Sequence, residues 1–352
     1  MRVTEAIAAI TGGNSLEEEQ AYAVMTEIME GLATDSQVAG LITALCMKGE
    51  TGEEITGFAK AIRAKAPPVR ISGVRLADTC GTGGDMLQTY NVSTTVAFIA
   101  AACGVPVAKH GNRAVSSKCG SADVLEALGV NVDLLPQTAI RCIEETGIAF
   151  LFAPTFHSAM KHAVKVRKEI GIRTVFNLLG PLVNPAGVQI QLIGVYAPEL
   201  TEIIGEVLTG LGVESALVVH GAGGMDEIST LGPTKITEVR YSTMQTYDLD
   251  PVKLGLQRAF KADLKGGNLR ENAEVTAGVL DGLPGPKLDL ALLNAAAVLY
   301  AADKVPDFAR GIEMAREAVS SGRARQKLED LKRFTARVSG KGEKAGARLS
   351  SA

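Results

Sequence analysis

The chain of 352 residues contains no tryptophan, and aromatic residues make up only 4% of it. Its core must therefore be built mainly from Ala, Val, Leu and Ile. The five cysteines form no Cys-x-x-Cys pair and show no Cys/His spacing typical of a zinc site. They are expected to be reduced thiols that mostly serve packing in a cytoplasmic protein, without a disulfide framework.

A basic surface and long apolar runs are missing as well. The formal net charge is −3, whereas nucleic-acid binding requires a basic face. The apolar stretch at residues 96–107 is too short to span a bilayer, and the first residues lack the pattern of a signal peptide. We therefore expect a cytoplasmic protein that binds neither nucleic acid nor membranes.

The composition that is present suits a large globular fold. Hydrophobic residues make up 46% of the chain and charged residues 21%. A chain of this length buries roughly 75% of the surface that its unfolded form exposes. The length also predicts two lobes rather than a single core.

Residues 1–66 predict a helical lobe. Ser15 with Glu18, and Thr51 with Glu54, fit capping boxes at helix starts, and a Pro-Pro pair then ends the helical pattern. Apolar residues recur at helical spacing in residues 16–30, 35–47 and 51–64.

From residue 76 onward, short apolar runs end in glycine-rich turns and are followed by helical stretches. This alternation predicts a mostly parallel sheet with helices on both faces. Ligands of such sheets bind beyond the carboxyl ends of the strands, where the glycine-rich segments fall. The predicted strands are residues 76–79, 105–109, 149–152, 191–195 and 216–219.

The fold class is therefore α/β: a small discontinuous helical N-terminal domain plus a larger α/β domain with a mostly parallel central sheet flanked by helices. The end of the chain is rich in Lys, Gly, Ala and Ser from Arg337 onward, so we expect a frayed terminus there. The expected division is a helical domain at 1–70, completed by a helical insertion around 162–182, an α/β domain at 74–161 and 183–345, and a flexible tail at 346–352.

The sequence DTCGTGGD at residues 78–85 follows the first predicted strand. Gly81, Gly83 and Gly84 allow backbone N–H groups to turn inward and surround an anion. Asp85 would repel a phosphate, and it suits a sugar hydroxyl or a metal bound through water. The motif is neither a Walker A loop nor a GxGxxG fingerprint, and taken alone it also fits a tight surface turn.

Two predicted helix starts at the same edge of the sheet carry hydroxyl groups. Ser93 and Thr94, together with the unpaired N–H groups of a helix start, suit a phosphate, although Asn91 or Ser93 would equally suit a plain helix cap. Ser121 is placed like a phosphate-binding N-cap. Asp123 fits a structural role beside the helix dipole.

The sequence KHGNR at residues 109–113 follows the second predicted strand. Lys109 suits a phosphate as a point charge, and His110 and Asn112 suit hydrogen bonds to a second substrate. A lone histidine, however, is more often structural than catalytic.

Adjacent carboxylates follow a later strand in HGAGGMDE at residues 220–227. Asp226 and Glu227 repel each other unless a cation lies between them, and hard oxygen ligands suit Mg²⁺. A solvated acidic turn would explain them as well. Arg167, on a predicted helix, suits bidentate binding of a carboxylate, although a surface helix of mixed charge explains it equally.

Taken together, these segments resemble the anthranilate phosphoribosyltransferase family. They occur in the family's order from about residue 78 to 230, and the N-terminal helices fit too. The combination of GTGGD, KHGNR and GMDE is specific, because the pyrimidine nucleoside phosphorylases of the same fold differ at the first loop and lack HGNR. After residue 240 the resemblance concerns the fold only. The matching segments are DTCGTGGD, NVST, KHGNR, SSKCGSADVLEALGV, FAPTFHSAM, VRKEIGIRTVFNLLGPLVNP and HGAGGMDEIS.

The resemblance implies that the 5-phosphoribosyl group of phosphoribosyl pyrophosphate (PRPP) is transferred to the amine of anthranilate, in tryptophan biosynthesis. It implies a cleft between two lobes, a homodimer joined through the helical domain, and Mg²⁺, with two ions when PRPP is bound, on Ser93, Asp226 and Glu227. The implied PRPP-binding residues are Gly81, Thr82, Gly83, Gly84, Asp85, Thr89, Asn91, Ser93, Thr94, Lys109 and Ser121. The implied anthranilate-binding residues are Gly81, His110, Asn112, Ala153, Pro154, His157, Met160 and Arg167.

The chemistry of such a transfer demands no strong general base, because an aromatic amine is a weak base and is neutral at pH 7. Positioning and charge stabilisation are expected to lower most of the barrier. Arg167 is expected to orient the acceptor, and His110 or His157 to take the proton that the amine loses late.

Three alternatives stay open at this point. The first is an enzyme like the pyrimidine nucleoside phosphorylases, which needs no Mg²⁺, and the second is a phosphoribosyltransferase for another aromatic acid. Met160 stands where some relatives carry tyrosine, so the choice of acceptor is the least defined. The third is a non-catalytic relative that binds nucleic acid, which the net charge and the intact Asp-Glu pair argue against.

Overall fold

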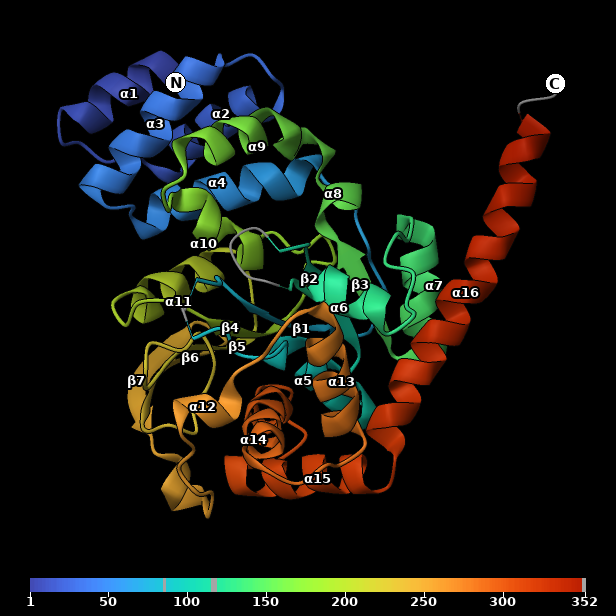
Figure 1. The fold of residues 1–352 in the computed structure, drawn as a ribbon. Helices are drawn as coiled ribbons and strands as arrows, with labels where there is room; N and C mark the ends of the chain where they lie inside the picture. Colours follow the sequence, from blue (N-terminus) through green and yellow to red (C-terminus); the bar gives the residue numbers. More distant parts are fainter. Residues whose placement is uncertain (85–86, 115–118, 350–352) are drawn as a thin grey trace.

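The computed structural model describes residues 1–84, 87–114 and 119–349, and Figure 1 shows two lobes. The smaller lobe begins with a bundle of four helices, in which the absence of a Cβ on Gly57 allows α4 to approach α2 closely. A Cβ on Gly57 would lie 2.3 Å from the carbonyl oxygen of Glu18. The helices are α1 (Val3–Thr11), α2 (Glu18–Met29), α3 (Asp35–Lys48) and α4 (Gly52–Lys65).

One of the two predicted capping boxes is confirmed and one is wrong. At α4, the Glu54 N–H donates to the Thr51 hydroxyl at 3.3 Å, as predicted. At α2, the cap is Glu17, whose N–H donates to the side chain of Gln20 at 3.1 Å. Ser15 does not cap the helix, because its hydroxyl accepts a hydrogen bond from Lys48 Nζ at 3.1 Å instead.

A second group of helices, far along the chain, completes the helical lobe. α9 packs against α2 and α3, and α10 packs against α3 and α4, so their buried side chains join the core of the bundle. Figure 1 shows them beside the first four helices. The group consists of α9 (Lys161–Ile170) and α10 (Val175–Leu182). The short helix α8 (Ala153–Phe156) and the 3₁₀ turn η1 (Ser158–Met160) lead into it from the sheet, and Phe156 of α8 is buried in the core of the larger lobe.

A seven-stranded sheet forms the centre of the larger lobe, with strand order β3-β2-β1-β4-β5-β6-β7. The first five strands are parallel and were predicted within two residues of their observed bounds. The two antiparallel strands β6 and β7 were not predicted. The strands are β1 (Ala77–Gly81), β2 (Val107–Gly111), β3 (Ile148–Phe152), β4 (Ile190–Gly194), β5 (Ser215–Gly221), β6 (Thr234–Arg240) and β7 (Thr243–Leu249).

Side chains of the central strands alternate between two hydrophobic cores, as the two-residue period of a strand requires. In β5, Leu217 and Val219 face α5 and α14, whereas Ala216 and Val218 face the core that α11 shares with the helical lobe. The sheet is therefore covered on both faces. The remaining helices are α5 (Val92–Ala102), α6 (Ser121–Ala127), α7 (Pro136–Thr146), α11 (Leu200–Gly210), α12 (Lys261–Leu264), α13 (Leu269–Leu280), α14 (Pro286–Ala301) and α15 (Phe308–Ser320), with the 3₁₀ turn η2 (Pro251–Leu254).

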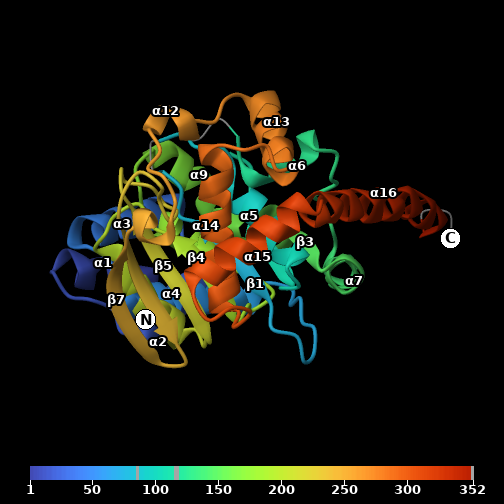
Figure 2. The same cartoon turned by 90° about the horizontal axis from the view of Figure 1, so that it is seen from below.

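The end of the chain differs from the prediction of a frayed terminus. Helix α16 (Arg323–Leu349) begins by burying Leu328, Leu331 and Phe334 against α5 and α7, and then extends away from the body (Figures 1 and 2). Residues 346–349 of the predicted tail are thus helical, while 350–352 lie outside the described residues. Along the described chain, no helix combines the length and the apolar character needed to cross a membrane.

Candidate active site

Three glycines at the carboxyl ends of adjacent strands create the centre of the site. Gly81 of β1 pairs with Gly194 of β4, and Gly221 ends β5. A Cβ on Gly194 would lie 1.5 Å from the backbone oxygen of Asp226, and one on Gly81 would lie 2.3 Å from Asp226 Oδ2. A Cβ on Gly221 would lie 2.4 Å from the backbone oxygen of Glu227. The acidic loop after β5 therefore lies directly against three strand ends.

The loop after β1 is anchored at several points. The Thr82 N–H donates to the Gly194 carbonyl at 2.9 Å, and the Gly83 N–H donates to Asp226 Oδ2 at 2.8 Å. Gly83 and Gly84 have φ values of +71° and +80°, which favour glycine. Downstream, Thr89 forms a β-bridge with Lys265. The structure thus brings the predicted glycine loop and Asp226 together, whereas Asp85 lies outside the described residues.

The start of α5 offers polar atoms that the protein does not use. Asn91 occupies the cap position but makes no capping hydrogen bond, and its amide donates to the Cys119 carbonyl at 3.2 Å. Within the described residues, Asn91 Oδ1 and Thr94 Oγ1 are buried without a hydrogen-bond partner. Because such atoms are costly to bury, they favour a ligand at this helix start over plain capping.

Lys109 places a buried positive charge beside this helix start. Its side chain is nearly inaccessible, and Nζ donates to the Thr79 carbonyl and, at 3.3 Å, to the Ser93 hydroxyl. Both partners are neutral, and among the described residues Lys109 forms no ion pair. A phosphate would be a stronger partner.

Asp78 and Asn184 form a buried polar link that the sequence analysis did not single out. Asp78 Oδ1 accepts from the His110 N–H at 3.2 Å, and Oδ2 accepts from the Asn184 amide at 2.8 Å. Burial raises the pKa of Asp78 to about 6, against the opposing effects of Lys109 and these hydrogen bonds. Only the position of Asp78 within the DTCGTGGD motif signalled its importance, and Asn184 had no comparable signal.

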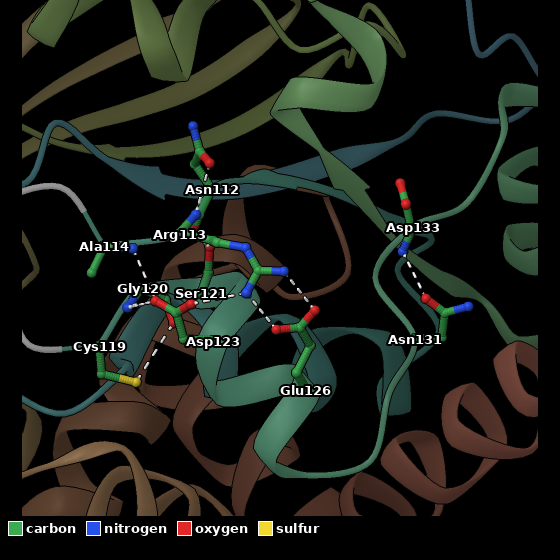
Figure 3. A network of polar contacts seen from close by, with 10 residues as sticks. All are labelled: Asn112, Arg113, Ala114, Cys119, Gly120, Ser121, Asp123, Glu126, Asn131 and Asp133. Carbon is green, nitrogen blue, oxygen red and sulfur yellow. Dashed lines mark hydrogen bonds and ion pairs between the residues drawn. The ribbon is translucent and has the colours of Figure 1, made fainter.

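The loop after β2 is held by a network of ion pairs, shown in Figure 3. Arg113 donates to both carboxylate oxygens of Glu126, at 2.5 and 2.8 Å, and to Asp123. Asp123 Oδ2 accepts from the N–H groups of Ala114 and Gly120, both at 2.9 Å. The side chain of Arg113 therefore serves to stabilise the loop.

Ser121 is placed differently from its prediction as an N-cap. The cap of α6 is Gly120, which has no side chain, and Ser121 is the first residue of the helix. Its hydroxyl donates to the Asn112 carbonyl at 3.2 Å, while Asn112 Oδ1 accepts from the Arg113 N–H at 2.8 Å (Figure 3). The two predicted site residues are therefore neighbours at the same rim.

Two buried histidines meet near the second predicted substrate position. The ring centroids of His110 and His157 are 5.1 Å apart, with the rings at 75°. His110 Nδ1 lies 3.2 Å from the Gly180 carbonyl, so this nitrogen carries the proton and Nε2 presents a lone pair. Nε2 of each ring is buried with no hydrogen-bond partner among the described residues.

Both imidazoles are neutral at pH 7. Burial lowers the pKa of His110 to about 3, helped by the proximity of His157, and it lowers the pKa of His157 to about 4. They are therefore weak bases that suit hydrogen bonding and late proton uptake rather than strong general-base catalysis.

The remaining candidates for the second substrate come from the junction with the helical lobe. Ala153 and Pro154 begin α8, and Met160 ends η1. Arg167 lies on α9 with its guanidinium carbon 5.1 Å from the ring centroid of Phe176, and burial lowers its pKa. In the described part of the chain, no carboxylate lies within ion-pair distance of Arg167. A carboxylate ligand suits this unpaired charge.

The predicted metal ligands carry oxygen atoms that suit a hard cation. The two carboxylates of Asp226 and Glu227 and the hydroxyl of Ser93 are oxygen ligands of the kind that Mg²⁺ prefers. Within the described residues, no group of three His, Cys, Asp or Glu side chains is arranged to hold a metal alone. The residues therefore fit an ion that takes its other ligands from a phosphate or from water.

Comparison with known proteins identifies the class that this fold and site define. Residues 4–66 match the helical bundle domain of a glycosyl transferase family, and residues 73–325 match its a/b domain. The anthranilate phosphoribosyltransferase of Desulforudis audaxviator is 51% identical, over 95% of this chain and 97% of that protein. The enzyme of the same name from Symbiobacterium thermophilum is 52% identical, over 94% and 96%. The chain belongs to the anthranilate phosphoribosyltransferase family.

Solved structures agree with this assignment. The anthranilate phosphoribosyltransferase of Thermus thermophilus superimposes with a TM-score of 0.89 at 46% identity, covering 94% of this chain and 99% of that one. The Saccharomyces cerevisiae enzyme, solved in complex with PRPP and Mg, gives 0.87 at 28% identity, covering 95% and 98%. The family resemblance and the fold class expected from the sequence are thereby confirmed.

Proposed function

We propose that this chain transfers the 5-phosphoribosyl group of PRPP to the amine of anthranilate and releases pyrophosphate, as a step of tryptophan biosynthesis. One observation carries the proposal: the glycine loop, the uncapped start of α5, the buried Lys109 and the acidic loop all meet at the carboxyl ends of β1, β2, β4 and β5. The identity of about half the residues to enzymes of that name, along nearly the whole chain, supports it.

The donor site binds the pyrophosphate and ribose of PRPP. Lys109 supplies positive charge, and Asn91, Ser93 and Thr94 supply polar atoms at the helix start. Ser93, Asp226 and Glu227 would hold Mg²⁺, as two ions when PRPP is present, and Mg²⁺ bound there would supply positive charge next to the leaving pyrophosphate. The full set comprises Gly81, Thr82, Gly83, Gly84, Asp85, Thr89, Asn91, Ser93, Thr94, Lys109 and Ser121.

The acceptor site orients anthranilate and receives its proton. Arg167 binds the carboxylate, while Gly81, Asn112, Ala153, Pro154 and Met160 line the ring. In the reaction, a bond forms between the amine nitrogen and C1 of the ribose, and the bond from C1 to pyrophosphate breaks. The amine then loses a proton to Nε2 of His110 or His157, whose neutral state supports this late uptake.

Assembly and location belong to the same proposal. The helical domain (1–70, with 162–182) joins two copies into a homodimer, and the α/β domain (74–161 and 183–345) carries the donor site. The exposed apolar side chains of Tyr22, Leu32, Met47 and Val164 in the helical lobe support this interface. The enzyme works in the cytoplasm.

The test is anthranilate consumption, followed by fluorescence, with PRPP and with or without Mg²⁺. We expect metal-dependent turnover that falls at least about 1,000-fold in the double variant Asp226→Asn/Glu227→Gln. Folded protein that binds PRPP but does not consume anthranilate would exclude this acceptor and favour another aromatic acid. Phosphorolysis of a pyrimidine nucleoside without Mg²⁺ would favour a nucleoside phosphorylase.

A further inference from the structure

Arg173 crosses from the helical insertion to the glycine loop. It lies between α9 and α10, and its Nη2 donates to the carbonyl oxygen of Gly84 in the loop after β1. The contact is close enough that a Cβ on Gly84 would lie 2.5 Å from Nη2. The guanidinium group therefore rests directly on the loop assigned to pyrophosphate.

Stacking, rather than an ion pair, holds this guanidinium group in place. Its carbon lies 4.2 Å from the ring centroid of Tyr196, which follows β4. In the described part of the chain, no carboxylate lies within 4.0 Å of Arg173, in contrast to Arg113 with its two carboxylates. A stacked arginine is oriented by the ring while its charge stays available.

The glycine loop lies between a carboxylate and a guanidinium group. Gly83 donates to Asp226 on one side, and Gly84 accepts from Arg173 on the other. A guanidinium group has five N–H donors, and within the described ranges a single neutral carbonyl accepts a hydrogen bond from this one. Phosphate oxygens are stronger partners for it than a carbonyl, because the hydrogen bonds are then assisted by charge on both sides.

The same lobe carries two more arginines of this kind. Arg63 of α4 and Arg167 of α9 also lack a carboxylate within 4.0 Å among the described residues, and burial lowers the pKa of both. Elsewhere in the described chain most arginines are ion-paired, as Arg240 and Arg325 are. Among the described arginines, those without an ion pair are thus concentrated in the helical lobe and its insertion, the lobe that Arg173 connects to the glycine loop.

We propose that Arg173 is a further PRPP-binding residue, which brings a guanidinium group from the helical insertion to the pyrophosphate on the glycine loop. The proposal rests on the function proposed above. Tyr196 acts through Arg173 as its positioning residue. PRPP binding thereby joins the two lobes, since the ligand contacts the α/β domain at the glycine loop and the insertion at Arg173.

The test measures PRPP binding directly, by calorimetry at fixed Mg²⁺ and without anthranilate. We expect Arg173→Gln to raise the Kd of PRPP about tenfold, the loss typical of one charge-assisted hydrogen bond. Arg173→Lys keeps the charge but loses the planar fork, so its increase is expected to be smaller. Arg70→Gln is the matched control, because this substitution makes the same change in charge. Arg70 is exposed and lies in the segment between α4 and β1.

Kinetics separate donor from acceptor effects. Arg173→Gln is expected to raise the KM of PRPP and to leave the KM of anthranilate within twofold of the unmodified enzyme. A Kd for PRPP equal to that of Arg70→Gln, or a rise in the KM of anthranilate alone, would overturn the assignment of Arg173. Protein that binds PRPP but never consumes anthranilate would overturn the proposed function, while the binding comparison would still decide the role of Arg173.

Discussion

The two ends of the sheet differ in how their charged and polar groups are paired. At the end where β1 and β5 begin, every charged side chain of the cluster has an opposite charge beside it. Arg75 contacts Glu214 and Asp303, both at 3.0 Å, and Arg240 contacts Glu238 at 3.0 Å and also Asp303. We call these five residues the paired cluster. Each of its two arginines and three carboxylates has an opposite charge within the cluster.

At the carboxyl ends of the same strands, the balance is left incomplete. Lys109 has neutral partners, and Asn91 Oδ1 and Nε2 of His110 and His157 have no hydrogen-bond partner among the described residues. An unpaired buried polar atom costs about 1–3 kcal/mol. A fold tolerates that cost where a ligand supplies the missing partner, so the unused polar atoms at the carboxyl ends favour a role in binding.

Gly194→Ala is expected to break the carboxyl end most severely. The added Cβ would lie 1.5 Å from a backbone atom of Asp226, so the acidic loop must move away from the strand ends. We expect kcat/KM to fall at least about 100-fold, and the free energy of unfolding to fall by about 3 kcal/mol. Steady-state kinetics and urea unfolding measure the two effects.

The matched control for this change is Gly40→Ala in α3. Its Cβ would lie 3.6 Å from Ile7 Cδ1, an ordinary contact. We expect full activity and a gain of about 0.5–1 kcal/mol, because alanine favours a helix. Full activity in Gly194→Ala would show that catalysis does not need the acidic loop to lie against β4.

The parts of the fold that could be predicted from the sequence are those that depend on residues close together in the chain. Each of the five parallel strands is a short apolar run that ends in glycine or polar residues, and Thr51 with Glu54 is a complete capping signal. β6 was missed because its buried positions include Thr237 and Glu238. β7 was missed because it is a largely exposed edge strand, so its sequence shows little apolar alternation.

The parts of the site that the sequence did not reveal depend on contacts between distant segments. Arg173 acquires its proposed role from Tyr196 and Gly84, and Asn184 from Asp78, which lies 106 positions away along the chain. The continuation of α16 past Arg337 has a different cause. Once the first part of the helix is docked, each further residue adds to an existing helix without a new nucleation step.

Glu238→Gln is expected to break the paired cluster without touching the site. Glu238 is buried and accepts from Arg240, from Tyr247 Oη at 2.9 Å and from Tyr300 Oη at 3.0 Å. Removing its charge leaves Arg240 with less compensation, so the free energy of unfolding should fall by about 3 kcal/mol. Turnover at 25 °C should stay within twofold of the unmodified enzyme. A large loss of turnover in folded protein would contradict the division of roles between the two ends.

Acidification is expected to weaken the carboxyl end and to spare the paired cluster. The pKa values of His110 (about 3) and His157 (about 4) lie below the ordinary value near 6.5, so between pH 6.5 and 4 the unfolded chain binds protons that the folded chain does not. Stability from these two groups is therefore lost as the pH falls. Asp78 opposes this, because its raised pKa of about 6 lets the folded chain bind a proton first. From pH 7 to 5 the net loss should be about 2 kcal/mol.

Urea unfolding at pH 7 and pH 5 checks this expectation. His157→Gln removes one of the two destabilising titrations, so its loss between the two pH values should be clearly smaller. Glu238→Gln, although less stable, should keep the full pH dependence of the unmodified protein. Equal stability at pH 7 and pH 5 in the unmodified protein would mean that the two imidazoles are not held neutral by burial.

Glu202→Gln is expected to have the smallest effect on the free energy of unfolding. It tests whether an ion pair stabilises the protein when it is not buried. Glu202 on α11 pairs with Lys235 on β6 at 2.7 Å, but both side chains are substantially exposed. Water and salt screen such a pair, so the free energy of unfolding should change by less than about 0.5 kcal/mol. The substitution is chemically the same as Glu238→Gln, and both acids contact a cation of β6. A loss as large as that of Glu238→Gln would show that burial is not what makes Glu238 important for stability.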